Sequence, residues 1–291
     1  MTKPMRSWMF VPGNKQRFLD KAASSDVDCV LLDLEDGVLP EDKGTARQMV
    51  AAVMGVDDFA PQRFVRINAV TTAWFAEDLE AIVVPGIEGI CLPKAETPGH
   101  VEELARRLDQ LEQKNGIEAG SVSIVAAIES PSALLLAPEI AKASPRVTGL
   151  IFGAEDYALD IGLGTNRQGE AAELIYARSA VVVAAAAARI LSIDGVFPNL
   201  DDPVGMEADI LQARRLGFSA KSTFNPRQVA EINRIFSPQP GEIEYARRVV
   251  KGFEEARSRG DASVAVGGQL VDLPIVMRAQ RLLSLVEGEA K

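Results

Sequence analysis

Short apolar runs alternate with longer amphipathic segments along the first 235 residues of the chain. Apolar runs of about four to eight residues between turn residues are typical of buried strands. Val27–Leu34 is almost entirely apolar, as a parallel strand covered by helices on both faces requires. The sequence therefore predicts eight strands: Ser7–Val11, Val27–Leu34, Arg63–Ile67, Gly86–Leu92, Val122–Ile128, Val147–Phe152, Ile190–Asp194 and Phe218–Lys221.

A helical segment follows each predicted strand, and several of these segments have proline near their first residue, where its missing N–H is not needed. The predicted helices are Lys15–Ser24, Pro40–Met54, Ala73–Val83, Pro98–Lys114, Pro131–Ala143, Glu170–Arg189, Pro203–Leu216 and Pro226–Ile235. Eight such units close a (β/α)8 barrel, so we predict an α/β TIM barrel. An open doubly wound sheet is the competing architecture, but no GxGxxG fingerprint follows the first strand.

The last part of the chain lies outside this repeat. We predict a barrel domain over residues 1–236 and a C-terminal helical extension, or lid, over residues 237–291. The extension contains a charged helix at Gly241–Arg259, a glycine-bearing link at Val266–Gly268 and a final helix at Pro274–Val286. An extension of this kind can pack on its own barrel or reach over a neighbouring subunit, and we expect it to contact the neighbour.

The composition is that of a globular protein, with 47% hydrophobic and 25% charged residues among 291. A net charge of −10 and the lack of a long basic run argue against a nucleic-acid partner. The longest apolar stretch is too short to span a bilayer, and the first ten residues lack the apolar core of a signal peptide, so we expect a cytoplasmic protein without a membrane partner. Cys29 and Cys91 lie inside apolar runs and read as small buried hydrophobic residues.

The chain contains a single histidine, His100, in the polar opening of a predicted helix. Zinc sites built from several histidines are therefore excluded, and a Ser-His-Asp triad would depend on a residue with no apparent partner. Any chemistry must then depend on carboxylates, arginine, lysine and a metal ion.

Charged residues collect where the predicted strands end, which in a TIM barrel is the catalytic face. Glu129 and Asp156 follow two consecutive strands, and hard oxygen ligands of this kind suit Mg²⁺, which keeps further positions for water and substrate. The alternative is that both residues cap the helices that follow. Glu35 and Asp36 could hold the waters of the metal.

Basic residues also stand at strand ends. Arg66 could grip a substrate carboxylate with two hydrogen bonds, or else form an ion pair with the acidic rim. Lys94 and Lys221 could bind phosphate, but structural ion pairs are the more ordinary role for both.

Nine motifs run in order over nearly the whole chain: Arg6–Ser7, FVPGN at Phe10–Asn14, LDLEDGVLPEDK at Leu32–Lys43, VRIN at Val65–Asn68, CLPKAE at Cys91–Glu96, AIES at Ala127–Ser130, FGAEDYALDIG at Phe152–Gly162, EADILQARRLGFSAKS at Glu207–Ser222 and VDLPIVMRAQRLL at Val271–Leu283. With these motifs the sequence resembles the citrate lyase beta subunit-like family of the aldolase/citrate lyase superfamily. That family includes malyl-CoA, citramalyl-CoA and citryl-CoA lyases.

The resemblance implies a TIM-barrel homotrimer, or a hexamer formed from two trimers, that uses Mg²⁺ (with Mn²⁺ as an alternative) and a coenzyme A thioester. Glu129 and Asp156 match the metal-ligand positions, and Arg66 and Glu129 match positions that contact the substrate. Asp272 matches an aspartate that one subunit delivers to the active site of its neighbour. The implied reaction is a retro-Claisen cleavage into acetyl-CoA and a 2-oxo acid, with Asp272 as the base and Arg66 clamping the acid.

The resemblance also places Phe10, Asn14 and Arg17 in a loop beside the substrate or coenzyme A. Two departures from the family pattern leave the carrier open between coenzyme A and an acyl-carrier protein: Asn225-Pro226 stands where His-Pro is frequent, and Asn199 stands where an acidic residue is frequent.

Two other functions stay open. One is a metal-dependent aldolase that acts on free hydroxy-oxo acids, although such enzymes commonly use a histidine base and His100 is poorly suited to that role. The other is a metabolite-binding relative, or a citrate lyase-like beta subunit, that is active only in a complex.

Overall fold

Eight parallel strands close into a barrel in the computed structural model, which describes residues 5–164 and 171–289. Strand β1 pairs with both β2 and β8, and this double pairing closes the sheet. The prediction of an α/β TIM barrel is confirmed. The strands are β1 Ser7–Pro12, β2 Cys29–Asp33, β3 Gln62–Arg66, β4 Gly89–Leu92, β5 Ser123–Ile128, β6 Val147–Phe152, β7 Leu191–Asp194 and β8 Ala220–Thr223.

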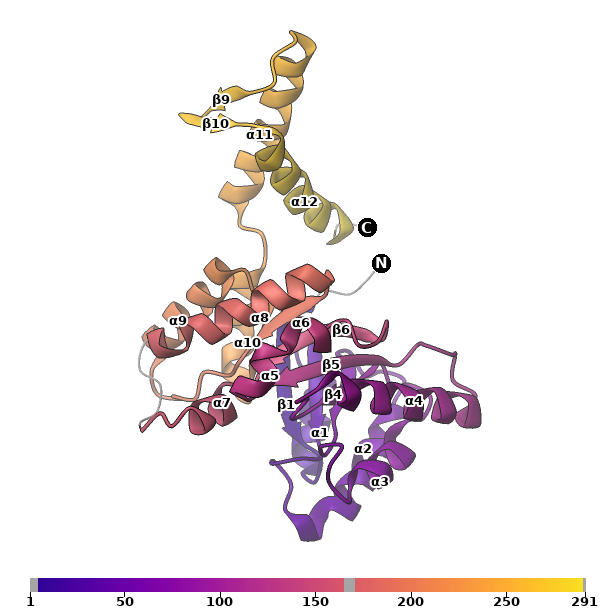
Figure 1. Ribbon diagram of the computed structural model, residues 1–291. Helices are drawn as coiled ribbons and strands as arrows, with labels where there is room; N and C mark the ends of the chain where they lie inside the picture. Colours follow the sequence, from indigo (N-terminus) through magenta and orange to yellow (C-terminus); the bar gives the residue numbers. More distant parts are fainter. Residues whose placement is uncertain (1–4, 165–170, 290–291) are drawn as a thin grey trace. The chain divides into compact units, whose positions relative to one another are not determined.

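Helices surround these strands on the outside of the barrel (Figure 1). They are α1 Gln16–Ala23, α2 Lys43–Met54, α3 Phe75–Ile82, α4 Pro98–Asn115, α5 Pro131–Leu135, α6 Ala137–Ile140, α7 Ala154–Asp160, α8 Ile175–Ala188, α9 Pro203–Leu216 and α10 Pro226–Phe236. Two short 3-10 turns, η1 Pro40–Asp42 and η2 Ala172–Leu174, precede α2 and α8.

Three helical segments differ from the sequence prediction. The single helix predicted over Pro131–Ala143 is broken at Leu136, because Pro138 has no N–H to continue the ladder and instead opens α6. The helix predicted from Glu170 begins only at Ile175, after Ala171 has adopted a left-handed backbone (φ +50°), and Glu170 itself lies outside the described residues. Helix α7 was not predicted, because its seven residues are too few to show a clear period.

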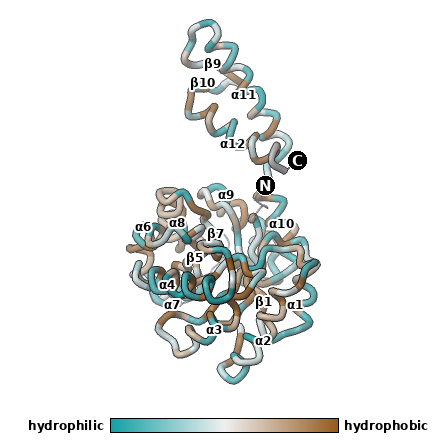
Figure 2. The backbone as a smooth tube through the Cα atoms, turned by 90° about the vertical axis from the view of Figure 1, so that its right-hand side faces the viewer, coloured by the Kyte–Doolittle hydropathy of each residue, from teal (hydrophilic) through white to brown (hydrophobic). Residues whose placement is uncertain are grey.

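The interior of the barrel is filled by side chains from all eight strands. Trp8 and Phe64 meet edge to face with ring centroids 4.8 Å apart. Cys29 and Cys91 are free, fully buried thiols in the same cluster, which confirms their interpretation as small hydrophobic residues. In Figure 2 hydrophobic colours gather around the central strands. The barrel is therefore a packed core, and a binding site has to lie at one of its ends.

The remaining residues form a second compact unit, which separates from the barrel unit between Arg234 and Ile235. It consists of α11 Pro240–Ser258, the antiparallel strands β9 Val264–Val266 and β10 Gln269–Val271, and α12 Leu273–Glu289. Its own core includes Val249, Phe253 and Val276.

The segment predicted as a simple link is a β-hairpin. Gly267 and Gly268 both have positive φ (58° and 81°), which is the requirement of a two-residue type I′ turn. The strands on either side have only three residues each, which is why the alternation was too short to identify them. No helix in the described ranges has the length and apolar character that a membrane crossing needs.

Candidate active site

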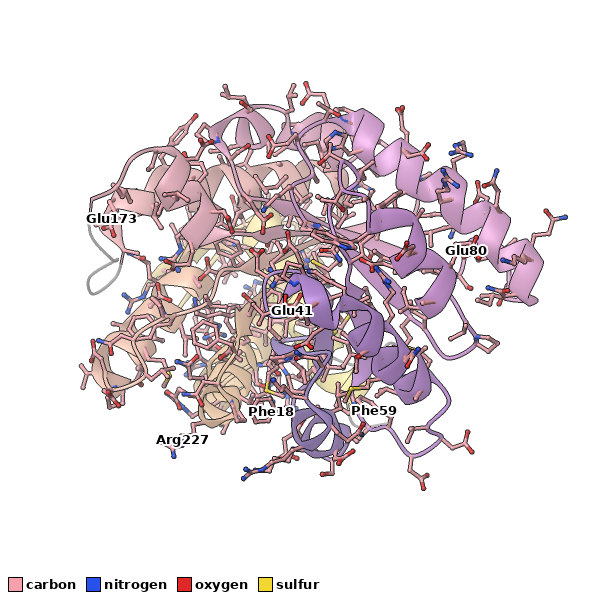
Figure 3. The ribbon with its side chains drawn as sticks, turned by 90° about the horizontal axis from the view of Figure 1, so that it is seen from below. Phe18, Glu41, Phe59, Glu80, Glu173 and Arg227 are labelled. Carbon is pink, nitrogen blue, oxygen red and sulfur yellow. The ribbon has the colours of Figure 1, made fainter. Side chains whose placement is uncertain are left out.

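A cavity of about 650 Å³ lies in the barrel unit at the end where the strands finish. Its apolar lining includes Phe10 and, from α1, Phe18, which is labelled in Figure 3. The charged residues among its described lining are Lys21, Asp33, Asp36, Arg66, Glu129, Glu155 and Asp156. Five of these seven are carboxylates, so an anionic substrate needs a cation to offset them.

Glu129 and Asp156 reach this cavity from neighbouring strands. Ile128 and Phe152, the last residues of β5 and β6, are partners in the ladder, so Glu129 emerges beside Gly153, and Asp156 follows in the first turn of α7. Glu129 is buried, with 7% of its surface exposed, and its Oε2 accepts a hydrogen bond from the backbone N–H of Lys94 at 2.8 Å. The structure thus brings both predicted metal ligands to one cavity.

The helix-cap alternative does not describe Glu129. Ser130 is the N-cap of α5, and its hydroxyl accepts from the Ala133 N–H at 3.0 Å. Gly153 is the N-cap of α7, and Asp156 lies within the first turn of that helix. A Cβ atom on Gly153 would lie only 2.2 Å from Glu129 Cγ, so the close approach of these two segments requires glycine.

The electrostatics of Glu129 favour a bound cation. Burial raises the pKa of Glu129 to about 7, and the charge of Asp156 adds to this shift, although the Lys94 N–H and Arg66 oppose it. A divalent cation between the two carboxylates would stabilise their charged forms. In the described ranges no group of three or more histidine, cysteine, aspartate or glutamate side chains could hold a metal ion. Two oxygen ligands fit Mg²⁺, which fills its remaining positions with water and substrate.

Arg66 is bound to the acidic rim, as the ion-pair alternative predicted. Its Nε and Nη2 donate to the two oxygens of Asp33 at 2.7 Å each, and its Nη1 lies 3.1 Å from Glu35 Oε2. The guanidinium also stacks on Phe10, 4.7 Å from the ring centroid. Burial opposes its charge, but the carboxylates of Asp33 and Glu35 raise the pKa of Arg66 above its ordinary value. Arg66 also lines the cavity, so a substrate carboxylate there would share its N–H groups with Asp33 and Glu35.

Asp33 is a residue of the candidate site that the sequence did not single out. Besides the two hydrogen bonds from Arg66, the Asp33 carboxylate accepts hydrogen bonds from the backbone N–H groups of Glu35 and Gly37, at 2.9 Å each. These four hydrogen bonds fix both the turn after β2 and the orientation of Arg66. An aspartate followed by Leu-Glu-Asp-Gly, with glycine four residues on, is a recognisable signal for such a side-chain turn.

Glu35 and Asp36 have different environments. Burial raises the pKa of Glu35 to about 8, against the lowering effect of Arg66. Its carboxylate contacts Arg66 and lies 3.7 Å from the Lys94 ammonium. Asp36 is exposed and lines the cavity, whereas Glu35 is absent from the described lining. Of the two, Asp36 is better placed to reach the waters of a metal.

Lys221 has a structural role. Its ammonium lies 2.6 Å from both Asp194 Oδ2 and Asp209 Oδ2, and Arg178 bridges the same two aspartates at 2.7 and 3.1 Å. All four side chains are almost completely buried. This cluster holds two positive and two negative charges in the wall of the barrel, and the structural alternative for Lys221 is confirmed.

The loop residues expected beside the substrate divide into two groups. Phe10 lines the cavity, but Asn14 and Arg17 do not occur in its described lining. Asn14 Nδ2 donates to Asp42 at 2.8 Å, and Arg17 is exposed on α1. Phe18, the next residue, does line the cavity and was missed, because one aromatic residue in an amphipathic helix normally indicates a core position.

Two further residues belong to neither group. Asp272 belongs to the second unit, where it is exposed, and its backbone oxygen accepts from Ile275 and Val276 at the start of α12. Its catalytic role stays a prediction. His100 is a partly exposed residue of α4 with Nδ1 3.3 Å from the Lys94 oxygen.

Comparison with known proteins adds to this geometry. A family model described as HpcH/HpaI aldolase/citrate lyase matches residues 6–226. The citrate lyase subunit beta of Leuconostoc mesenteroides subsp. cremoris is 39% identical over 284 residues, 97% of this chain and 93% of that protein. The (3S)-malyl-CoA thioesterase of Cereibacter sphaeroides is 32% identical over 288 residues, 99% and 96% of the two chains.

A solved structure shares the fold over almost the full length. It is protein CitE from Mycobacterium tuberculosis in complex with magnesium, acetoacetate and coenzyme A. The alignment covers 97% of each chain at 30% identity, with a TM-score of 0.80.

Proposed function

Because the chain belongs to the HpcH/HpaI aldolase/citrate lyase family, we propose that it is a Mg²⁺-dependent carbon–carbon lyase. Its substrate is a β-hydroxyacyl-CoA thioester, which it cleaves into acetyl-CoA and a 2-oxo acid. The observation that carries this proposal is the convergence of Glu129 and Asp156 on one cavity beside Arg66. The relatives named as a lyase subunit and a malyl-CoA thioesterase, and the CitE complex with magnesium and coenzyme A, support it.

Each residue then has a chemical task. Glu129 and Asp156 would hold Mg²⁺, which when bound supplies Lewis acidity toward a developing oxyanion. Arg66 would orient the carboxylate of the acid portion through the guanidinium N–H groups that do not face Asp33, which holds the edge formed by Nε and Nη2. Phe10 covers the guanidinium and reduces its contact with water, which strengthens its hydrogen bonds.

The bond cleavage needs a base and a place for an electron pair. A carboxylate base, which we assign to Asp272 of a neighbouring subunit, takes the proton of the β-hydroxyl group. The hydroxyl oxygen becomes the carbonyl oxygen of the 2-oxo acid as the carbon–carbon bond breaks. The electron pair of that bond moves to the thioester as an enolate, which takes up a proton to give acetyl-CoA. The reverse sequence condenses the same two products.

A contribution from a neighbouring subunit requires an oligomer, for which we propose a homotrimer or hexamer. Leu270, Leu273 and Met277, which surround Asp272 in sequence, are 69%, 56% and 60% exposed. Large apolar side chains that are exposed near one another in the sequence are consistent with a contact to another chain. This exposure supports a docking role for the C-terminal unit. The cytoplasmic location expected from the sequence stays a prediction.

The proposal is tested by incubating the isolated protein with malyl-CoA or citramalyl-CoA, in Mg²⁺ or in EDTA. We expect a 2-oxo acid and acetyl-CoA to be released only in Mg²⁺. A complete lack of activity toward both thioesters would favour the alternative suggested by relatives named as subunits, in which the chain acts only within a larger complex. Release of free malate and coenzyme A, without acetyl-CoA, would instead indicate a thioesterase.

A further inference from the structure

Lys43 is a buried lysine whose ammonium group is bound by neutral oxygens, with no carboxylate contact among the described ion pairs. It is the first residue of α2, and only 5% of its surface is exposed. Its Nζ donates to the backbone oxygens of Leu34 and Glu35 at 2.6 and 2.8 Å, and to Asn68 Oδ1 at 2.8 Å. An ammonium group has three N–H donors, so these three acceptors use all of them.

Local helix stability does not explain a lysine at this position. The N-terminal end of a helix carries partial positive charge, so a cation in the first turn is electrostatically unfavourable. Burial of an ammonium group adds a further desolvation cost. The Trp74 ring, 5.1 Å from Nζ, offsets only part of this cost. The reason for the lysine therefore lies in what its three acceptors connect.

The acceptors belong to two neighbouring strand ends. Leu34 and Glu35 directly follow β2, and Asn68 follows β3 by two residues. The last ladder pair of these strands is Asp33 with Arg66, and the Leu34 N–H donates to the Arg66 oxygen at 2.8 Å. Lys43 joins the two strand ends beyond this backbone hydrogen bond, where Asn68 Nδ2 also donates directly to the Leu34 oxygen at 3.0 Å.

These strand ends carry the groups that orient Arg66. Asp33 holds one edge of the guanidinium, and the Glu35 carboxylate lies 3.1 Å from Nη1. Because Lys43 fixes the backbone oxygen of Glu35, it also restricts the position of the Glu35 Cα atom, from which the side chain extends toward Arg66. A displacement of about 1 Å in a substrate-positioning group can reduce turnover by about a hundredfold.

We propose that Lys43 is a positioning residue, which fixes the ends of β2 and β3 and thereby sets the orientation of Arg66 toward the acid portion of the substrate. This inference depends on the proposed function, in which Arg66 binds the carboxylate of the 2-oxo acid. Lys43 does not occur in the described lining of the cavity, so it acts through other residues and does not touch substrate.

The test is the variant Lys43→Met, which keeps an unbranched side chain of similar length and removes all three donors. The matched control is Lys114→Met, because Lys114 is an exposed lysine of α4 that pairs only with Glu80 in the described contacts. Binding of pyruvate to the Mg²⁺-loaded protein is measured by calorimetry. KM and kcat for cleavage of citramalyl-CoA, and the midpoint of thermal unfolding, are measured for the same proteins.

We expect Lys43→Met to raise the Kd for pyruvate about tenfold or more, and Lys114→Met to leave it within about twofold of the wild type. A loss of stability alone would lower the unfolding midpoint and the active fraction, but would not change the Kd of the folded protein. Unchanged pyruvate binding in Lys43→Met, with only a lower midpoint, overturns the inference. If Lys43→Met does not fold, Lys43→Gln, which keeps a shorter amide donor, takes its place. The Kd of Lys43→Gln for pyruvate is then compared with that of Lys114→Met in the same way.

Failure of the proposed function gives a different result. A wild-type protein that binds pyruvate but cleaves no thioester refutes the lyase assignment, and the Kd comparison still decides the role of Lys43. A wild-type protein that binds no pyruvate overturns the inference, because Arg66 then has no acid to orient.

Discussion

The contact between Gly153 and Glu129 makes a sharp prediction for the variant Gly153→Ala. Gly153 has φ −87°, which any L-residue can adopt, so the backbone does not oppose the change. The obstacle is steric, because the three atoms nearest to a new Cβ all belong to Glu129: Cγ at 2.2 Å, Oε1 at 2.6 Å and Cδ at 2.8 Å. Ordinary carbon–carbon contacts need about 3.5 Å, so the Glu129 side chain must shift by roughly 1 Å.

This shift has two measurable effects. Overpacking of a buried site costs about 1–3 kcal/mol in the free energy of unfolding. If Glu129 holds Mg²⁺ as proposed, movement of its carboxylate by about 1 Å should reduce Mg²⁺-dependent turnover by about a hundredfold. Urea unfolding in EDTA measures the first effect, and Mg²⁺ titration of the cleavage rate measures the second. Gly99→Ala is the control, because its nearest contact would be an ordinary 3.6 Å to Thr97 Oγ1.

A double-mutant cycle with Glu129→Ala isolates the cause. In that background the three clashing atoms are gone, so Gly153→Ala should cost little of the free energy of unfolding. The reasoning is refuted if Gly153→Ala is as stable and active as Gly99→Ala. It is also refuted if the loss of stability is equally large with and without the Glu129 side chain.

Three other variants test the remaining features of the site. Asp156→Asn should abolish Mg²⁺-dependent turnover while it leaves the thermal midpoint of the metal-free protein nearly unchanged; gross unfolding would show that Asp156 is structural instead. Burial raises the pKa of Glu35 from 4.5 to about 8, so the folded protein retains a proton that the unfolded chain releases. The stabilisation from Glu35 is therefore complete below about pH 4.5 and is lost as the pH rises through about 8. Glu35→Gln, which does not titrate, should flatten this dependence in urea titrations at pH 6 and pH 9 in EDTA, and parallel curves for both proteins would contradict the prediction. Asp272→Ala should reduce turnover far more than thioester binding, and mixing it with Glu129→Gln protein should restore part of the activity in shared oligomers. No recovery after confirmed subunit exchange would exclude a role for Asp272 across an interface.

The alternation of apolar runs and helical segments was sufficient to predict the barrel, because each strand is covered on both faces and leaves a continuous apolar signal. The same reasoning predicted that Glu129 and Asp156 would emerge together, since parallel strands finish at one end of a barrel. The limits are equally physical. Asp33 was overlooked because its partners come from two strands, and nothing in the local sequence states that Arg66 lies beside it. Helix α7 and the strands of the β-hairpin are too short for their hydrophobic periodicity to distinguish them from a loop.

The four-charge cluster in the barrel wall has a consequence for how this sequence can vary. Arg178, Asp194, Asp209 and Lys221 cancel one another in a place that water does not reach, so loss of any single member would leave an uncompensated ion inside the protein. Replacement of the whole quartet by apolar residues, or paired exchange of an acid and a base, avoids that cost. Among homologous sequences these four positions should therefore covary, and an ancestor that lost one of them would have been under pressure to change a second.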